Sequence, residues 1–266
     1  MKLSIIGGGN MGGSIVRGLV QGSIFKASDI TVIDVQEAPL EALQSFNPEI
    51  KTALIDYDSI SEADIIILAV KPWMINDAIL DIKFKMDYKK QIVISVAAGV
   101  TIQDMNKVLN KVSEGYSLPP LFRVIPNTAI SIKESTTLVA TDNADSDQTD
   151  LILKIFNELG NAILIDESKI DAGTSLASCG IAYLFRYVRA ATMAGVEMGF
   201  YPQEALQLVI HTMKGAADLL IKNGQNPENE IDKVATPGGL TIKGLNELEA
   251  NGFSDAIIKA MKMSRK

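Results

Sequence analysis

The chain has 266 residues, 47% of them hydrophobic, and its 32 acidic and 25 basic side chains give a formal net charge of −7. This length allows a substantial core in one large domain or two smaller ones, and we expect two. The negative charge argues against nucleic acid or an anionic membrane as a partner, because both require a basic face. A single cysteine, Cys179, and a single histidine, His211, exclude an internal disulfide and a zinc cluster, so no metal is expected.

The chain begins with a short apolar run, residues 3–6, that leads into spaced glycines and then a helical pattern to Gln21. In such a strand–turn–helix unit the first glycine permits the turn, the second lets a pyrophosphate approach, and the third allows close packing. The free N–H groups of the helix then bind phosphate. Because the glycine pattern alone is a weak signal, a turn without a ligand is the alternative. The expected dinucleotide-binding residues are Ile6, Gly7, Gly9, Asn10, Met11 and Gly12.

This apolar run is four residues long, which is too short for a signal peptide. No uncharged stretch approaches the ~18 residues of a membrane span. We therefore expect a soluble, cytoplasmic protein.

A second strand, expected over 30–34, ends in Asp34, which follows Gly12 by 22 residues. The acid that binds the adenosine ribose of a dinucleotide is expected at a spacing of ~20 residues. Its carboxylate accepts hydrogen bonds from a 2′-hydroxyl but repels a 2′-phosphate, and Val35-Gln36-Glu37 supplies no arginine to offset that repulsion. Of NADH and NADPH, NADH is therefore favoured. A helix opened by Pro39 is expected next, within 35–47.

The run 65–70, which follows Asp64, is apolar throughout, as in a strand buried on both faces, and it stops at Lys71-Pro72. Since Pro72 cannot continue a ladder, Lys71 lies at the carboxyl end of the strand, where ligands of open α/β sheets bind. A solvated lysine is the alternative. Another strand, 91–96, leads into Ala97-Ala98-Gly99, whose small side chains either close a turn or admit a flat ring.

Strands and helices continue to alternate up to about residue 166. Thr101 is expected to cap a helix through Asn110, with Asp104 completing a capping box. Further strands are expected at 121–125, before a polar turn, at 136–140 and at 162–165, with a helix around 147–159 between the last two. The alternation predicts an α/β fold with a doubly wound, mostly parallel sheet. An antiparallel strand is compatible with this pattern at the far edge of the sheet.

After Asp166 only helical patterns remain. Two long helices are expected at 169–199 and 202–223, separated by Gly199 and Pro202, then a helical block from Pro227 and a last helix at 254–263. Charged side chains within 169–199 exclude a membrane span. Long, rather apolar helices attached to a nucleotide-binding sheet favour packing against a partner subunit, so we expect a homodimer or a larger homo-oligomer.

Within this region, Thr236-Pro237-Gly238-Gly239 precedes a helix whose first turn offers free N–H groups and the Thr241 hydroxyl. This arrangement predicts a second anion cradle. A plain connector capped by Thr236 is the alternative.

The block 232–249 resembles the C-terminal signature of the pyrroline-5-carboxylate reductase family, with Thr236 in place of the usual Ser and Leu240 where Thr or Ala is common. The resemblance covers essentially the whole chain and includes 7–12, 69–72, 95–99 and 123–128. It implies an N-terminal Rossmann-type domain over 1–166 and an all-helical substrate and dimerisation domain over 167–266. It also implies NAD(P)H-dependent reduction of 1-pyrroline-5-carboxylate to L-proline.

The same resemblance implies a position for each ligand. The adenosine ribose would lie near Asp34 and Asp56, and the substrate carboxylate would bind N–H groups at the start of the last cradle. The residues implied for the nicotinamide are Ala69, Val70, Lys71, Pro72, Ser95 and Ala97. Those implied for the substrate are Thr236, Gly238, Gly239, Leu240 and Thr241, with Thr241 in the catalytic role.

A cyclic imine suits a chain with so few proton donors. Its nitrogen is basic enough to carry its own proton near neutral pH, whereas ketone reduction normally uses a positioned His, Lys or Tyr. Thr241 would then orient the nitrogen, and orientation with proximity provides much of the acceleration. Lys71 is assigned to the opening of the cofactor-binding site and not to proton transfer.

Family members usually show Ser-Gly-Ser-Gly-Pro-Ala-Tyr where this chain has residues 177–183, Ala-Ser-Cys-Gly-Ile-Ala-Tyr. The difference motivates two alternatives, namely a related reductase for another small imino acid and a nucleotide-binding regulatory protein without catalysis. A β-hydroxyacid dehydrogenase of the 6-phosphogluconate type is a third. It resembles the chain less well, because the catalytic lysine expected on the first long helix has no counterpart except Lys169.

Overall fold

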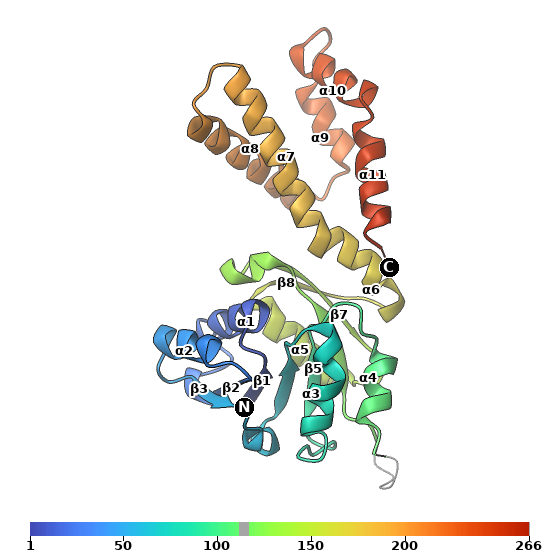
Figure 1. Cartoon of the computed structure of the whole chain (residues 1–266). Coiled ribbons are helices and arrows are strands. Elements are labelled where there is room, and N and C mark those ends of the chain that lie inside the picture. The colour runs from blue at the N-terminus through green and yellow to red at the C-terminus, as the bar shows by residue number, and fades with distance from the viewer. Residues whose placement is uncertain (112–116, 266) are drawn as a thin grey trace. The chain divides into compact units, whose positions relative to one another are not determined.

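A single sheet organises the N-terminal part of the chain (Figure 1), and in the described residues it has eight strands in the order β3-β2-β1-β4-β5-β6-β7-β8. Neighbouring strands are parallel except β6 and β7, so the expected mostly parallel, doubly wound sheet is confirmed. The strands are β1 Leu3–Ile6, β2 Ile30–Asp34, β3 Lys51–Leu54, β4 Ile65–Leu68, β5 Ile92–Ser95, β6 Leu121–Ile125, β7 Ser135–Thr141 and β8 Gly160–Leu164.

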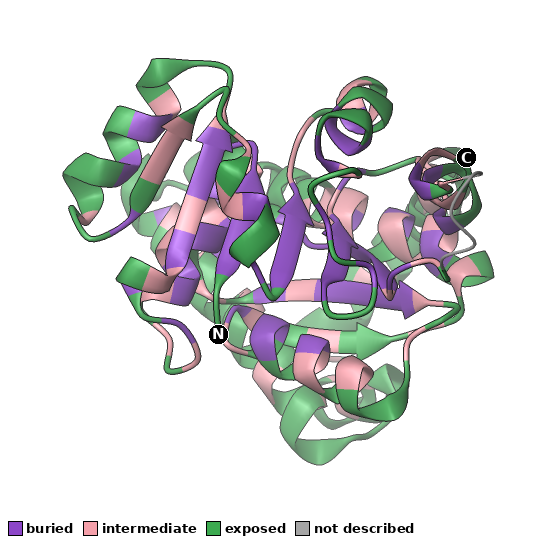
Figure 2. Cartoon of the chain, turned by 90° about the horizontal axis from the view of Figure 1, so that it is seen from below, coloured by how far each residue is buried: buried purple, intermediate pink, exposed green. Residues whose placement is uncertain are grey.

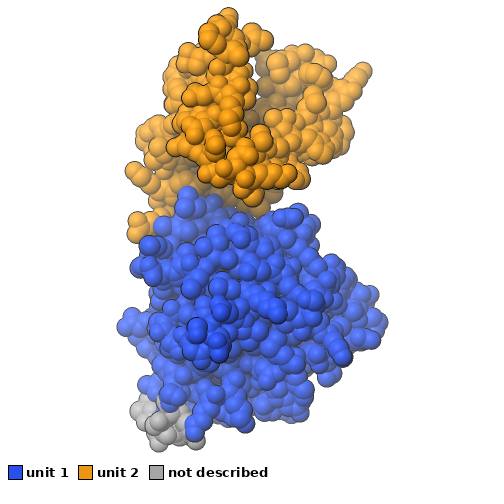
Figure 3. All heavy atoms as spheres, turned by 180° about the vertical axis from the view of Figure 1, so that it is seen from behind, with its two compact units in different colours: residues 1–178, 266 blue, residues 179–265 orange. Residues whose placement is uncertain are grey.

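The computed structural model describes residues 1–111 and 117–265, which divide into two compact units, 1–178 and 179–265 (Figure 3). The domain limits expected from the sequence, 1–166 and 167–266, stay a prediction. Helices of the first unit are α1 Asn10–Val20, α2 Glu37–Phe46, α3 Ile75–Ile82, α4 Ile102–Leu109, α5 Ser146–Asn157 and α6 Ile170–Thr174.

Two hydrophobic clusters cover the two faces of the sheet. Alternate strand residues such as Ile5 and Ile67 pack with α1, α2 and α5, whereas Ile66 and Val93 pack with α3 and α4. The strands β1, β4, β5 and β6 are buried along their whole length, as their purple colour in Figure 2 shows. Continuous burial explains why these strands read as unbroken apolar runs.

Local signals explain several boundaries. Thr101 Oγ1 accepts a hydrogen bond from Asp104 N at 3.1 Å and caps α4, as expected. The second helix begins at Glu37, two residues before Pro39. The first long helix is helical from Ile170 to Glu197, close to the expected 169–199, but a π turn at Ser175–Cys179 divides it into α6 and the helix that follows.

The second unit is wholly helical in the residues described. Its helices are α7 Gly180–Glu197, α8 Pro202–Asn223, α9 Pro227–Val234, α10 Leu240–Ala250 and α11 Phe253–Met263. The helices α7 and α8 approach closely where a Cβ on Gly195 would lie 2.7 Å from Ala205 Cβ. Among the described helices of the chain, none is both long and apolar enough to span a bilayer.

A buried arginine ties the start of α6 to the sheet. The Arg123 side chain on β6 is 4% exposed and lies 3.1 Å from Asp171 Oδ1 and 3.4 Å from Glu167 Oε1. The same Glu167 oxygen accepts from Ile102 N at 2.7 Å, so it also holds the start of α4. Arg123 is the buried member of these pairs, since the side chains of Glu167 and Asp171 are 28% and 43% exposed, so truncating it removes a packed side chain and both ion pairs at once.

Arg123→Ala is therefore expected to lower the free energy of unfolding by about 3 kcal/mol, measured by urea denaturation. Lys90→Ala is the control, because Lys90 pairs with Asp87 at the surface, where a pair contributes less than about 1 kcal/mol. Equal effects of the two substitutions would contradict this role of Arg123.

Candidate functional site

The three glycines between β1 and α1 serve different purposes. Gly7 has φ +103°, and a Cβ there would lie 2.6 Å from Ala69 O. A Cβ on Gly12 would lie 1.9 Å from Gly7 O, so the helix could not approach the strand with any other residue. A Cβ on Gly9, in contrast, would meet no described atom within 4 Å. Packing thus requires Gly7 and Gly12, whereas Gly9 keeps a space open in front of the backbone.

The start of α1 is suited to an anion. Its N-cap is Gly9, without a side-chain cap, and the Gly13 N–H donates to Gly9 O at 2.7 Å. The N–H groups of the first turn have no acceptor within the helix. No acidic side chain occupies that turn. The partial positive charge of the helix end is therefore available to a phosphate group.

Asp34 lies at the end of β2, as expected, but its carboxylate also holds the glycine loop. Its Oδ2 accepts from Gly8 N at 2.7 Å and its Oδ1 accepts from Gln36 N at 3.0 Å. Each oxygen has a second lone pair, so both can still accept from a hydroxyl. Sequence reasoning missed the bond to Gly8, which orients the carboxylate beside the loop.

Asp56 follows the neighbouring strand β3 and is exposed, with Oδ1 accepting from Asp58 N at 3.0 Å. Ile55 before it has φ +51°, an uncommon conformation for a β-branched residue. Its N–H donates to Asp34 O at 3.0 Å, which joins the ends of the two strands. Both predicted ribose-binding acids therefore lie at one edge of the sheet.

The segments predicted to face the nicotinamide follow β4 and β5, which are adjacent and parallel, so their ends also meet at this edge. Ala69 N donates to Ile6 O at 2.8 Å and Val96 N donates to Leu68 O at 3.0 Å. Lys71 is exposed, and Val70 and Pro72 are partly exposed. Ser95 and Ala97 are buried, and Ser95 Oγ accepts from Ala97 N at 3.3 Å. They therefore fix the backbone that follows β5 and are not exposed to a ligand in the described residues.

The second predicted cradle lies in the helical unit, at the start of α10. Gly238 has φ +72°, and Gly239 N donates to Thr236 O at 2.9 Å, which closes the turn. The helix is capped by Gly239 without a side-chain bond, so the expected cap by Thr236 is not formed, whereas the choice between a cradle and a plain connector stays open. Its first turn has no acidic residue, and Leu240 and Thr241 are exposed. The turn thus presents unpaired N–H groups and a hydroxyl together.

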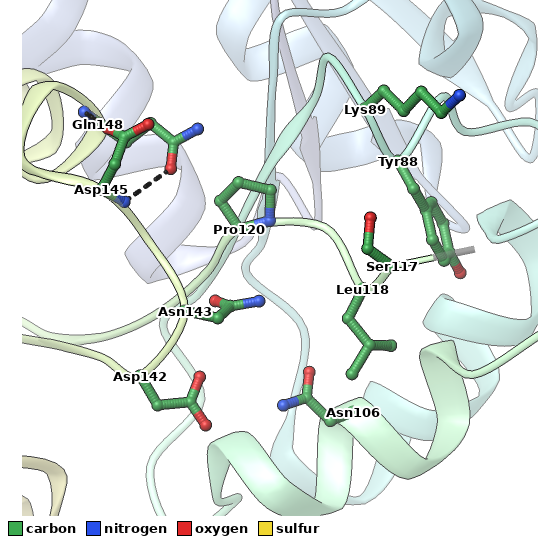
Figure 4. Close-up of a pocket in the computed structure, with 10 residues that line it drawn as sticks. All are labelled: Tyr88, Lys89, Asn106, Ser117, Leu118, Pro120, Asp142, Asn143, Asp145 and Gln148. Atoms are coloured by element: carbon green, nitrogen blue, oxygen red, sulfur yellow. Dashed lines mark hydrogen bonds between the residues drawn. The ribbon is translucent and has the colours of Figure 1, made fainter. Parts of the chain in front are cut away.

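A hollow of about 690 Å³ elsewhere in the first unit contains none of the predicted site residues (Figure 4). Asn143 in its wall accepts from Leu121 N at 3.0 Å and donates to Pro119 O at 2.8 Å. Asp145 and Gln148 form the capping box of α5. These polar groups form hydrogen bonds that hold the start of β6 and of α5. We therefore assign them a structural role and do not propose a binding site in this hollow.

The helical unit leaves large apolar side chains at its surface. Leu184 and Phe185 on α7 are 54% and 62% exposed, and Leu208 on α8 is 55% exposed. The described residues of α9, α10 and α11 include none that is buried. Helices that bury so little of their apolar surface within one chain favour association with another copy.

The described residues contain no group of three or more His, Cys, Asp or Glu side chains arranged to hold a metal ion. His211 is exposed on α8, 3.2 Å from Gln207 Oε1, and belongs to neither cradle. The predicted site residues supply backbone N–H groups, the hydroxyls of Ser95, Thr236 and Thr241, the Asn10 amide, the carboxylates of Asp34 and Asp56, and the Lys71 ammonium.

Two family models match the chain. Residues 2–99 match the family described as NADP oxidoreductase, coenzyme F420-dependent, which supports a nicotinamide cofactor. Residues 167–266 match the family described as pyrroline-5-carboxylate reductase dimerisation, which supports a homo-oligomer.

Relatives that match nearly the whole of this chain are also pyrroline-5-carboxylate reductases. Pyrroline-5-carboxylate reductase 2 of Dictyostelium discoideum is 37% identical over 279 residues, which cover 99% of this chain and 90% of the relative. Pyrroline-5-carboxylate reductase 1 of that organism is 36% identical over 271 residues, 97% of this chain but 48% of the relative, so the chain spans about half of that protein. The solved pyrroline-5-carboxylate reductase of Coxiella burnetii has a TM-score of 0.88 and 28% identity, with 99% of this chain and 95% of that one covered.

Proposed function

Since the chain belongs to the pyrroline-5-carboxylate reductase family, we propose that it reduces the C=N bond of 1-pyrroline-5-carboxylate to give L-proline. The observation that supports this proposal is a pair of helix starts, at α1 and at α10, that are each capped by glycine without a side-chain bond and have no acidic residue in the first turn. The first suits the pyrophosphate of a dinucleotide, and the second suits the carboxylate of a small imino acid.

The residues present fit a reduced dinucleotide. The open space at Gly9 would admit the pyrophosphate to the N–H groups of Asn10 and Met11, and Asp34, which already accepts from Gly8 N, would accept from the ribose hydroxyls. The strip from Ala69 to Pro72 then faces the nicotinamide, which supplies the hydride when bound. Lys71 belongs to this strip and is exposed, and we assign it to the opening of the cofactor site, where it provides a positive charge for the anionic dinucleotide.

At the second cradle, the first-turn N–H groups around Gly239, Leu240 and Thr241 hold the substrate carboxylate, and Thr236 and Gly238 shape the turn. The protonated ring nitrogen donates to the Thr241 hydroxyl oxygen, which orients the C=N bond. When hydride adds to the ring carbon, the π electrons of C=N become the nitrogen lone pair, and the amine then takes a proton from water. No protein acid is required in this scheme.

We place the active form in a homodimer joined through the helical unit. The exposed apolar side chains of α7 and α8 support this arrangement, because burying them is favourable by ~25 cal/mol per Å². Sedimentation of the purified chain at dimer mass supports the proposal, and a monomer at micromolar concentration contradicts it.

A screen of small cyclic imino acids with NADH and NADPH tests the function. The proposal expects oxidation of the nicotinamide with 1-pyrroline-5-carboxylate and formation of proline. Turnover only of a different imino acid would favour the related-reductase alternative, and turnover of a β-hydroxyacid with NAD(P)⁺ would favour the dehydrogenase. Dinucleotide binding without any turnover would favour the regulatory alternative.

We expect NADH to be preferred over NADPH, and Asp34→Ser to relax the preference. The carboxylate accepts from a 2′-hydroxyl and repels a 2′-phosphate, and a serine hydroxyl repels neither. The measurement is the ratio of kcat/KM for NADH to that for NADPH, with Glu41→Gln as a control that removes one exposed acid from α2. A wild-type chain with higher kcat/KM for NADPH would contradict this role of Asp34.

A further inference from the structure

The chain has one tryptophan, Trp73, and this residue is exposed. It is 76% exposed, which is the largest value for any large apolar residue in the described part of the first unit. Single exposed apolar residues are common on protein surfaces, so exposure alone does not indicate a ligand. The position of Trp73 in the sheet unit is what distinguishes it.

Trp73 lies in the short turn that follows β4, Pro72–Met74. β4 is the neighbour of β1, and the strand order runs from β1 to β3 in one direction and from β4 to β6 in the other. The helix after β1 packs on one face of the sheet, whereas the helix after β4 packs on the opposite face. Open α/β sheets bind ligands at such a switch point, outside the carboxyl ends of the strands. Trp73 therefore stands on one side of the switch point and the glycine loop on the other.

The turn that carries Trp73 is held in place from both sides. Met74 N donates to Lys71 O at 2.8 Å, and the ring of Pro72 restricts the backbone before the tryptophan. The turn leads directly into α3, whose first residue, Ile75, is fully buried. Since the backbone is fixed and an indole has few torsions to order, Trp73 presents a preorganised apolar surface at this edge of the sheet.

The order of the strands indicates which part of a dinucleotide would lie at Trp73. The adenosine ribose is assigned to Asp34, at the end of β2, and the pyrophosphate to Gly9, after β1. From β2 through β1 the next strand is β4, so the nicotinamide half would extend toward the turn after β4. The flat faces of aromatic rings pack well against one another. An indole at this position suits the nicotinamide ring and its ribose.

We infer that Trp73 is a binding residue for the nicotinamide half of the dinucleotide, against which its indole packs when the cofactor binds. This inference rests on the dinucleotide site of the proposed function and not on the identity of the imine. Packing removes the indole and one side of the cofactor from water, which favours binding. The adenosine half, which is assigned to the opposite side of the glycine loop, gains nothing from this contact.

The first test uses the emission of the full-length chain, which reports on residue 73 alone because there is no other tryptophan. NAD⁺ is the probe, since it does not absorb tryptophan emission as NADH does. We expect acrylamide to quench the free protein readily and to quench it about twofold less with NAD⁺ bound. ADP has the adenosine and the phosphates but no nicotinamide half, so it should leave quenching unchanged.

Two outcomes of this measurement would overturn the inference. One is equal quenching with and without saturating NAD⁺. The other is an indole already shielded from acrylamide in the free protein, because Trp73 would then be covered by a second copy of the chain and not by the cofactor.

The second test is affinity. Trp73→Ala is expected to raise the Kd for NADH about tenfold and to leave the Kd for ADP within about twofold of wild type, both measured by calorimetry. Trp73→Phe keeps an aromatic face and should retain most of the NADH affinity. Phe84→Ala is the matched control, because Phe84 is 72% exposed, follows the other end of α3 and contacts Lys83.

Unchanged NADH affinity in Trp73→Ala, or equal losses for NADH and ADP, would overturn the inference while the proposed function stands. A wild-type chain that shields Trp73 on binding NAD⁺ but reduces no imine would instead overturn the proposed function and leave this inference in place.

Discussion

Gly9→Ala is expected to weaken dinucleotide binding by about tenfold to a hundredfold while the protein stays folded. The Gly9 backbone has φ −64°, which alanine adopts readily, and an added Cβ meets no described protein atom within 4 Å. That Cβ would occupy the space proposed for the pyrophosphate and move it away from the N–H groups of α1. Losing one charge-assisted hydrogen bond costs ~1.5–3 kcal/mol, which corresponds to the stated factor.

The measurement is the Kd for NADH by fluorescence titration, together with Tm. Gly12→Ala is the informative comparison, because its Cβ would lie 1.9 Å from Gly7 O and should lower Tm as well as affinity. Gly215→Ala on α8, where a Cβ meets nothing within 4 Å, should leave the NADH affinity unchanged and should not lower Tm, because alanine is favoured over glycine inside a helix. Wild-type NADH affinity in a folded Gly9→Ala variant would exclude this loop from the pyrophosphate site.

Thr241→Val is expected to lower kcat about a hundredfold and to leave NADH binding unchanged. Valine keeps the shape of threonine and the N–H groups of the α10 cradle, so the substrate carboxylate is still held. It removes the hydroxyl that orients the ring nitrogen, and a donor or acceptor placed at a reacting group contributes a factor of ~100 or more.

Steady-state kinetics with the imine and a separate NADH titration distinguish the two effects. Thr241→Ser should retain most of the activity, because it keeps the hydroxyl. Thr212→Val is a suitable control, since the Thr212 hydroxyl bonds to Leu208 O on an exposed face of α8. An unchanged kcat, or equal losses in turnover and in NADH affinity, would remove Thr241 from the substrate site.

The elements with strong local signals could be predicted from the sequence. The glycine spacing located α1 and the turn before it, and the Thr101 cap located α4. β3 was missed because its four residues, Lys-Thr-Ala-Leu, are only partly buried and show neither a continuous apolar run nor a clear alternation. The helix α3 was missed with it, although its apolar face is fully packed.

Features that depend on distant residues had no sequence signal. The π turn, Ser-Leu-Ala-Ser-Cys, has no pattern that distinguishes it from an ordinary helical segment, and the amide that bonds to Ala177 O in it is 50 positions away, at Asn127. The bond from Gly8 N to Asp34 likewise joins two motifs that were each identified separately. Sequence patterns thus predicted two anion cradles but not the contacts, such as the bond from Gly8 N to Asp34, that fix the loops around them.

A crystal structure of the chain with bound NAD(H) and a non-reactive proline analogue tests the central claim most directly. The account predicts the pyrophosphate at Gly9, the analogue carboxylate on the first turn of α10, and the hydride-bearing carbon ~3–3.5 Å from the ring carbon. Thr241 Oγ should be within hydrogen-bond distance of the ring nitrogen. Two ligands far apart, with the segment from Thr236 to Thr241 in contact with neither, would contradict the account.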